Sequence, residues 1–232
     1  MAGDERLALL AELEHTDEAI GAELAELDEL AAAADAIHER AVELEQLLAR
    51  LPEEREAAAA AVEEADQAVV AAQEVLERAR EVLAAAEKVD DPDRLAEARR
   101  FEVRARDRAH IGERKAAAAR EHAAELESRG DAAQVQAAEL ERRAQELADV
   151  LRRRPRLTDD AVPAPGSGPS GVAEWGTPVR AALLVARSQL AAEKDAVVRQ
   201  ANELGSVVLG EPVPALATRE VVRRVEGTLA DR

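Results

Sequence analysis

The sequence contains no cysteine and no tyrosine, and only one phenylalanine and one tryptophan among its 232 residues. Without cysteine, the chain has no disulfide framework and no zinc site built from thiolates. The shortage of aromatic side chains excludes a large globular core, because such cores rely on bulky residues. The composition is dominated instead by Ala, Glu, Leu and Arg, which favour α-helices. We therefore expect long, thin helical packing.

Motifs that carry catalysis or ligand binding are also lacking. The sequence has no phosphate-binding loop, no dinucleotide fingerprint and no nucleophile elbow. Its histidines lack the i, i+4 pairing of metal ligands, and they stand at His15, His38, His110 and His122. Carboxylate pairs on a rod have no concave pocket in which to act as acid and base. We expect no catalytic residue, metal, cofactor or small-molecule substrate, and so a protein that is not an enzyme.

Long apolar runs are absent too. The first residues are acidic, and no run approaches the roughly 18 apolar residues that a membrane-spanning helix needs. We expect no signal peptide and no membrane association, and hence a cytoplasmic protein.

Apolar residues recur every 3.5 positions along two stretches on either side of Asp90 and Asp91. Such a repeat places one apolar row, which we call the seam, on one face of a coiled-coil helix. The seam of the first stretch is Leu30, Ala34, Ile37, Ala41, Leu44, Leu48, Leu51, Arg55, Ala58, Val62, Ala65, Val69, Ala72, Leu76, Ala79, Leu83 and Ala86. The seam of the second stretch is Leu95, Ala98, Glu102, Ala105, Ala109, Gly112, Ala116, Ala119, Ala123, Leu126, Gly130, Ala133, Ala137, Leu140, Ala144, Leu147 and Leu151.

The two seams complement each other if the chain folds back at the two aspartates. Residues equidistant from the turn then face each other, and most pairs set Leu, Ile or Val against Ala or Gly, as in Leu76 with Ala105. Pairing a large side chain with a small one fills a narrow core without voids. Asp91 as N-cap and Pro92 as the first helical residue mark the start of the returning helix.

We therefore predict an all-α fold, with a long antiparallel two-stranded coiled-coil hairpin over residues 5–152 and its turn at 89–92. Pro52 interrupts the first helix, and the sequence favours a kink there over a reversal because no capping residues surround it. Gly130 lies at the same level of the second helix, so we predict a hinge at Pro52 and Gly130.

The C-terminal part reads as a linker followed by helices. Residues 153–177 are rich in Pro, Gly and Ser, which predicts a flexible linker. Residues 178–232 predict two helices, the first beginning at Pro178 and ending at Gly205. We expect them to pack on the unpaired N-terminal segment as a small bundle at the base of the hairpin. That contact lies within one chain or joins a homodimer through residues 5–28 and 178–204. Trp175 is either an anchor onto these helices or a partner-binding residue.

Charge is distributed unevenly along the chain. Residues 1–90 carry 25 acids and 7 bases, whereas residues 94–120 carry nine bases and four acids. The basic stretch can bind nucleic acid or an anionic partner through Arg100, Arg104 and Arg108. Alternatively it neutralises the facing helix through pairs such as Asp66 with Arg120 and Glu87 with Arg99. The lack of interleaved aromatic residues favours neutralisation.

A resemblance adds one further expectation. The run Leu47-Leu48-Ala49-Arg50-Leu51-Pro52-Glu53-Glu54, followed by a hairpin, resembles the helical-hairpin region of bacterial zinc-ribbon coiled-coil proteins over residues 5–150. The ribbon cysteines are absent here, so no metal ligand carries over. With 28 Arg against 3 Lys, the composition is similar to that of proteins from GC-rich bacteria. We expect a structural or adaptor coiled coil that mediates protein association, or alternatively a nucleic-acid-associated one that uses residues 94–120.

Overall fold

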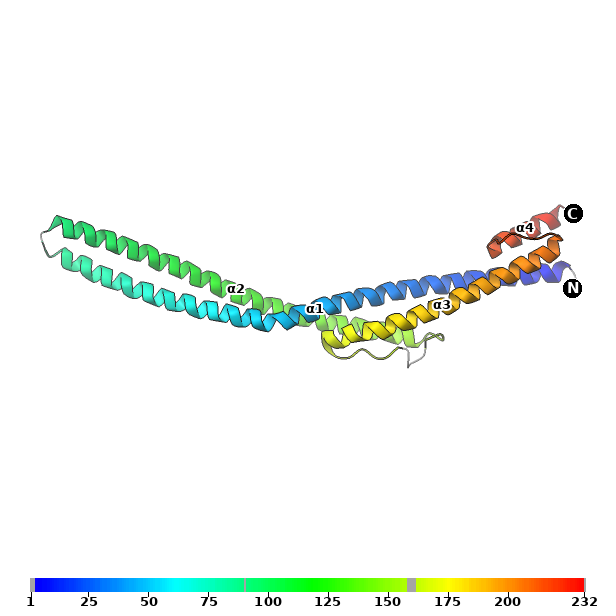
Figure 1. Ribbon diagram of the computed structural model, residues 1–232, viewed down its shortest axis with the longest axis horizontal. Coiled ribbons are helices and arrows are strands. Elements are labelled where there is room, and N and C mark those ends of the chain that lie inside the picture. The colour runs from blue at the N-terminus through cyan, green and yellow to red at the C-terminus, as the bar shows by residue number, and fades with distance from the viewer. Residues whose placement is uncertain (1–2, 90, 158–161, 232) are drawn as a thin grey trace. The chain divides into compact units, whose positions relative to one another are not determined.

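The computed structural model describes residues 3–89, 91–157 and 162–231, and within these ranges it holds four α-helices and no β-strand (Figure 1). The helices are α1 (Gly3–Ala86), α2 (Pro92–Arg152), α3 (Gly168–Leu209) and α4 (Thr218–Ala230). The all-α class expected from the composition is confirmed. The chain divides into two units, which we describe separately. Unit 1 comprises Met1–Val42 and Ala138–Arg232, and unit 2 comprises Glu43–Ala137.

The turn between α1 and α2 belongs to unit 2. α1 ends at Ala86, and α2 begins at Pro92, whose ring fixes φ near the helical value. Asp91 caps α2, because its Oδ1 accepts hydrogen bonds from the backbone N–H groups of Asp93 at 3.1 Å and Arg94 at 3.2 Å. Asp90, the remaining residue of the turn expected at 89–92, lies outside the described residues.

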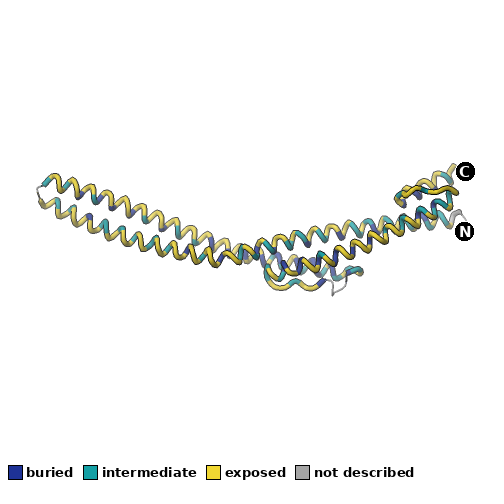
Figure 2. Tube along the Cα trace, viewed as in Figure 1, coloured by how far each residue is buried: buried dark blue, intermediate teal, exposed yellow. Residues whose placement is uncertain are grey.

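In unit 2 the two helices run side by side in opposite directions (Figure 1). None of the seam positions between Leu44 and Ala137 is exposed, whereas most residues between them are (Figure 2). Leu51 and Leu126 lie in one buried cluster. A Cβ atom on Gly112 would lie 3.6 Å from Val69 Cγ2, which is ordinary contact distance. The core of unit 2 therefore includes a contact of a large side chain with a glycine at Val69 and Gly112, and a cluster of leucines around Leu51 and Leu126.

Both helices continue through the residues of the predicted hinge. Pro52 lies inside α1 and Gly130 inside α2, so the chain does not reverse at the proline. The guanidinium of Arg55 occupies the space beside Gly130, where a Cβ atom would lie 2.8 Å from Arg55 Cζ. Arg55 Nη2 also donates to the backbone carbonyl of Glu127 at 3.1 Å. The glycine thus makes room for a cation that binds the neighbouring backbone, and the hinge stays a prediction.

In unit 1, α3 and α4 pack on the first turns of α1. The core cluster there consists of Leu10, Ala201, Val221, Val222 and Val225, each less than 5% exposed. Ion pairs also cross between α3 and α1. Arg180 Nε lies 2.5 Å from Asp35 Oδ1, and seven residues later Arg187 Nε lies 3.0 Å from Asp28 Oδ1. The sequence analysis missed this repeat of cations on one helix and aspartates on the other, although both series are spaced by seven.

The start of α3 differs from the prediction. Pro178 was expected to open the helix after a linker over residues 153–177, but α3 begins at Gly168 and Pro178 lies inside it. The added turns bury Trp175, which is 3% exposed and donates its Nε1–H to the carbonyl of Pro163 at 2.9 Å. Burying the 150–250 Å² of a tryptophan contributes about 4–6 kcal/mol, which exceeds the roughly 3 kcal/mol cost of an interior proline.

The end of α3 differs as well. The sequence predicts an end at Gly205, yet the helix continues to Leu209 and is capped by Gly210 at φ 71°. Gly205 is buried instead against α4, where a Cβ atom would lie 2.5 Å from Val221 Cγ1. The absence of a side chain at this position lets α3 and α4 approach closely.

Candidate protein-binding surface

The arginines chosen from the sequence lie on the outside of α2 in unit 2. Arg100, Arg104 and Arg108 are all exposed. Arg104 Nε donates to the backbone carbonyl of Arg100 at 3.2 Å. Among the described residues, the side chains of Arg100 and Arg108 form no ion pair. Their charge is therefore available to a binding partner.

Of the two ion pairs predicted between the facing helices, the described residues form one. Arg120 Nη2 does lie 2.6 Å from Asp66 Oδ1, as predicted. The second predicted pair, Glu87 with Arg99, is not formed in the part of the chain that the structure describes. The expectation was wrong there because side chains at flanking positions of adjacent helices remain in water, where an ion pair contributes little and does not fix geometry.

A groove of about 460 Å³ lies at the end of unit 2 that carries the turn. We call it the tip groove, and its lining residues are Val82, Ala85, Ala86, Val89, Arg94, Glu97, Ala98, Phe101 and Arg104. Val82 and Val89 remain 45% and 49% exposed. Three of the lining residues are alanines, and larger apolar side chains accompany them. The charged lining residues are two arginines and one acid, Glu97.

The tip groove was not predicted from the sequence. A signal was present, because Val82 and Val89 are seven residues apart at positions that flank the seam. Such positions usually carry charged residues in coiled coils. Valine there indicates an apolar strip beside the core rather than a solvated edge.

A second apolar spot lies nearby on the outer face of α2. Val103 is 50% exposed there. It lines a shallow hollow together with Arg99, Arg100 and Arg104. Near the turn, exposed valine therefore lies beside arginine in two hollows, the tip groove and this one.

One charged seam position, Glu102, is buried in unit 2. Glu102 is 6% exposed, and its Oε1 accepts a hydrogen bond from Arg106. Ala79, the seam residue predicted to face it, is fully buried. A buried carboxylate with one arginine partner is a satisfied structural group.

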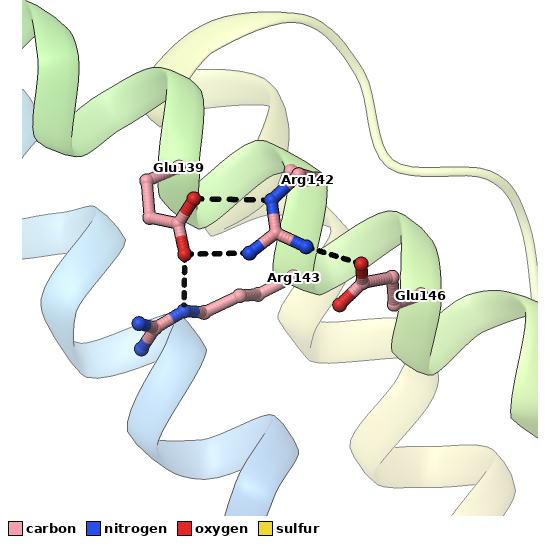
Figure 3. Close-up of polar contacts among 4 residues, drawn as sticks. All are labelled: Glu139, Arg142, Arg143 and Glu146. Atoms are coloured by element: carbon pink, nitrogen blue, oxygen red, sulfur yellow. Dashed lines mark hydrogen bonds and ion pairs between the residues drawn. The ribbon is translucent and has the colours of Figure 1, made fainter.

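The best-connected polar cluster lies in unit 1 on α2 (Figure 3). Arg142 donates through Nη2 to Glu139 Oε1 at 2.7 Å and through Nε to Oε2 at 3.0 Å, and Arg143 Nε donates to Oε1 at 2.9 Å. The hydrogen bonds from Arg142 and then Arg143 lower the pKa of Glu139 from 4.5 to about 2. Glu146 accepts from the far side of Arg142. Glu139 is ionised at neutral pH and so cannot act as an acid there.

Two arginines of the basic run that follows α2 are neutralised within unit 1. Arg154 pairs with Glu26 of α1. Arg156 Nη1 lies 2.6 Å from Glu193 Oε1, and its Nε lies 3.2 Å from Glu23 Oε1. The hydrogen bond to Glu193, followed by that to Glu23, raises the pKa of Arg156 above its ordinary value. Arg154 and Arg156 are therefore used in the packing of unit 1, whereas Arg153 of the same run is exposed.

Trp175 is removed from the set of candidate partner-binding residues. It is 3% exposed, and its single polar group already donates to Pro163. The anchoring role that the sequence analysis left open fits this environment. Of the residues singled out for a partner, the arginines near the turn remain.

Neither a metal site nor a membrane span offers another function for the described residues. Within them, no group of three or more His, Asp or Glu side chains is placed to hold a metal ion. No helix in the same ranges is long and apolar enough to cross a membrane. Comparison with protein-family models, curated proteins and solved structures found no match to this chain. The function must therefore be argued from the residues and their geometry.

Proposed function

We propose that the protein is a non-enzymatic structural or adaptor protein that brings proteins together through unit 2. The observation that carries this proposal is the tip groove, where valines stay half exposed beside arginines. Exposed apolar surface with arginine nearby is typical of protein-binding sites. In unit 1, by contrast, Arg154 and Arg156 of the basic run, the tryptophan and the valines of α4 are already used in packing.

Unit 2 acts in this proposal as an antiparallel coiled-coil hairpin, with unit 1 as a small helical bundle. The lack of exposed residues among the seam positions of unit 2 supports it. Deletion of residues 70–76 together with 105–111 tests it, because these segments are equidistant from the turn and their loss keeps every other facing pair. We expect the helix content per residue and a cooperative unfolding transition to survive, whereas deletion of 70–73 alone should lower Tm clearly by breaking the seven-residue phase. Equal loss of Tm in both variants would contradict the hairpin.

Affinity purification from cells that produce the protein tests the function itself. We expect the tagged full chain to enrich at least one protein. A single comparison variant lacks residues 70–76 and 105–111 and also carries Val82→Ala and Arg104→Glu. This variant should no longer enrich that protein. Light scattering on the purified chain then separates partner binding from self-association through residues 5–28 and 178–204. The proposal would be refuted if the chain is a monomer and enriches no protein at any expression level of the tagged chain.

A nucleic-acid-associated protein is the second candidate. The observation in its favour is that Arg100 and Arg108 have no ion-pair partner among the described residues. Binding would rest on phosphate contacts and weaken steeply with salt. Charge reversal of Arg100, Arg104 and Arg108 to Glu should then abolish binding of a DNA oligonucleotide at about 50 mM salt. If the unmodified chain does not bind under these conditions, this candidate is removed.

A further inference from the structure

We propose that the tip groove binds an acidic amphipathic α-helix of a partner protein. This inference rests on the proposed function and specifies the chemistry of the partner. It follows from three properties of the groove: its apolar surface, the charge on its rim, and its position between two antiparallel helices.

The apolar surface is suited to a row of side chains on a helix. Ala85, Ala86 and Ala98 leave space between the two helices of unit 2, and Val82 and Phe101 flank that space. A third helix that packs into such a space buries residues at i, i+3, i+4 and i+7 along one face. Val82 and Val89 are about half exposed in the free chain, so covering them with a third helix supplies the driving force for binding.

The charge on the rim selects an acidic occupant. Arg94 and Arg104 line the groove, and Glu97 is its one acid. Arg99 and Arg100 adjoin it and carry no ion pair among the described residues. Arg94 Nε already lies 3.3 Å from Asp91 Oδ2. At physiological salt the screening length is about 8 Å, so the guanidinium groups of Arg99, Arg100 and Arg104 act together on a ligand in the groove. Glutamates on the flanks of the bound helix would pair with them.

Other occupants fit less well. A second copy of the chain would bring one arginine rim against another, which costs free energy. Single-stranded nucleic acid relies on stacking against aromatic side chains, and the groove offers only Phe101, which is half-buried. A flat anionic membrane surface would cover the exposed acids Glu77, Glu81 and Glu87 as well as the arginines, whereas a single helix in the groove contacts only the groove lining.

Fluorescence anisotropy with the full chain tests the proposal. The probe is a labelled synthetic peptide with leucines along one helical face and glutamates beside them. Two comparison peptides have the same leucines flanked by lysine, or the same composition with leucines distributed around the helix. We expect saturable binding of the first peptide and at least tenfold weaker binding of the other two.

Variants of the chain locate the site. Arg104→Glu should weaken binding of the acidic peptide at least tenfold, and Val82→Ala should weaken it several-fold, since both residues line the groove. Arg129→Glu is the matched control, because it makes the same charge change at an exposed position of α2 outside the groove. Circular dichroism should show the same helix content in all three variants, so that a loss of binding reports the groove.

Several outcomes would overturn the proposal. These are absence of saturable binding, equal binding of the peptide with distributed leucines, and equal effects of Arg104→Glu and Arg129→Glu. Binding of a single-stranded oligonucleotide or of vesicles with anionic lipid at about 150 mM salt, with loss through Arg104→Glu, would assign the groove to those ligands instead. A partner that is enriched through unit 2 while the peptide fails would remove the helix assignment but leave the proposed adaptor function standing.

Discussion

Gly130 and Gly112 both sit in the middle of α2, yet replacing each by alanine should change stability in opposite directions. At Gly112 a Cβ atom would meet Val69 Cγ2 at 3.6 Å, an ordinary contact. At Gly130 it would overlap the guanidinium of Arg55 and lie 2.8 Å from its Cζ. The arginine would have to leave, and its hydrogen bonds to the carbonyls of Glu127 at 3.1 Å and Leu126 at 3.5 Å would be lost.

The size of two opposing contributions decides whether each substitution raises or lowers the free energy of unfolding. Glycine in a helix interior costs about 0.5–1 kcal/mol relative to alanine, and Gly112→Ala should gain that amount. Hydrogen bonds to a charged group contribute about 1.5–3 kcal/mol, less where water still reaches the group, as it does at half-buried Arg55. Gly130→Ala should therefore lower the free energy of unfolding by about 0.5–2 kcal/mol.

Urea unfolding followed by circular dichroism measures both changes. The Arg55→Ala background provides the control, because the guanidinium is gone and Gly130→Ala should then stabilise the chain as much as Gly112→Ala does. If Gly130→Ala stabilises the unmodified chain by the same amount as Gly112→Ala, the inferred role of Arg55 is wrong.

Three further predictions concern unit 1. Gly205→Ala should lower the free energy of unfolding by about 1–3 kcal/mol, because its methyl group would press on buried Val221, and a thermal scan that shows no loss of Tm would contradict this packing. Trp175→Ala should cost about 3–5 kcal/mol in urea unfolding, whereas Trp175→Phe, which keeps a ring but loses the bond to Pro163, should cost clearly less. The pKa of Glu139 is depressed to about 2, so its stabilising contribution is present above its ordinary value of 4.5 and is lost as the pH falls toward 2. The gap in urea midpoint between the unmodified chain and Glu139→Gln should therefore shrink from pH about 6 to pH about 3, and a constant gap would exclude this linkage.

The features that the sequence predicted correctly depend on local or periodic information. The all-helical class follows from composition, and the cap at Asp91 follows from three adjacent residues. The lack of exposed residues among the seam positions of unit 2 follows from a seven-residue repeat that continues for many turns. The pair Arg120 with Asp66 follows from the same repeat once the turn is located.

The features that the sequence predicted wrongly depend on contacts between distant segments. Pro178 and Gly205 are helix breakers by intrinsic preference, and both lie inside α3 because burial of neighbouring groups outweighs that preference. The tip groove could not be foreseen from pairing rules, since these rules say which residues face each other but not which flanking side chains stay exposed. Of the candidate site, the sequence therefore supplied the arginines, and the structure supplied the apolar surface beside them.

The burial of Trp175 gives unit 1 an optical signal of its own. The chain has no tyrosine, and its one tryptophan belongs to unit 1. Indole emission therefore reports the environment of that unit alone, while ellipticity sums over all helices in both. If unit 2 melts first, the chain will lose much of its helical signal while its emission remains that of a tryptophan shielded from water.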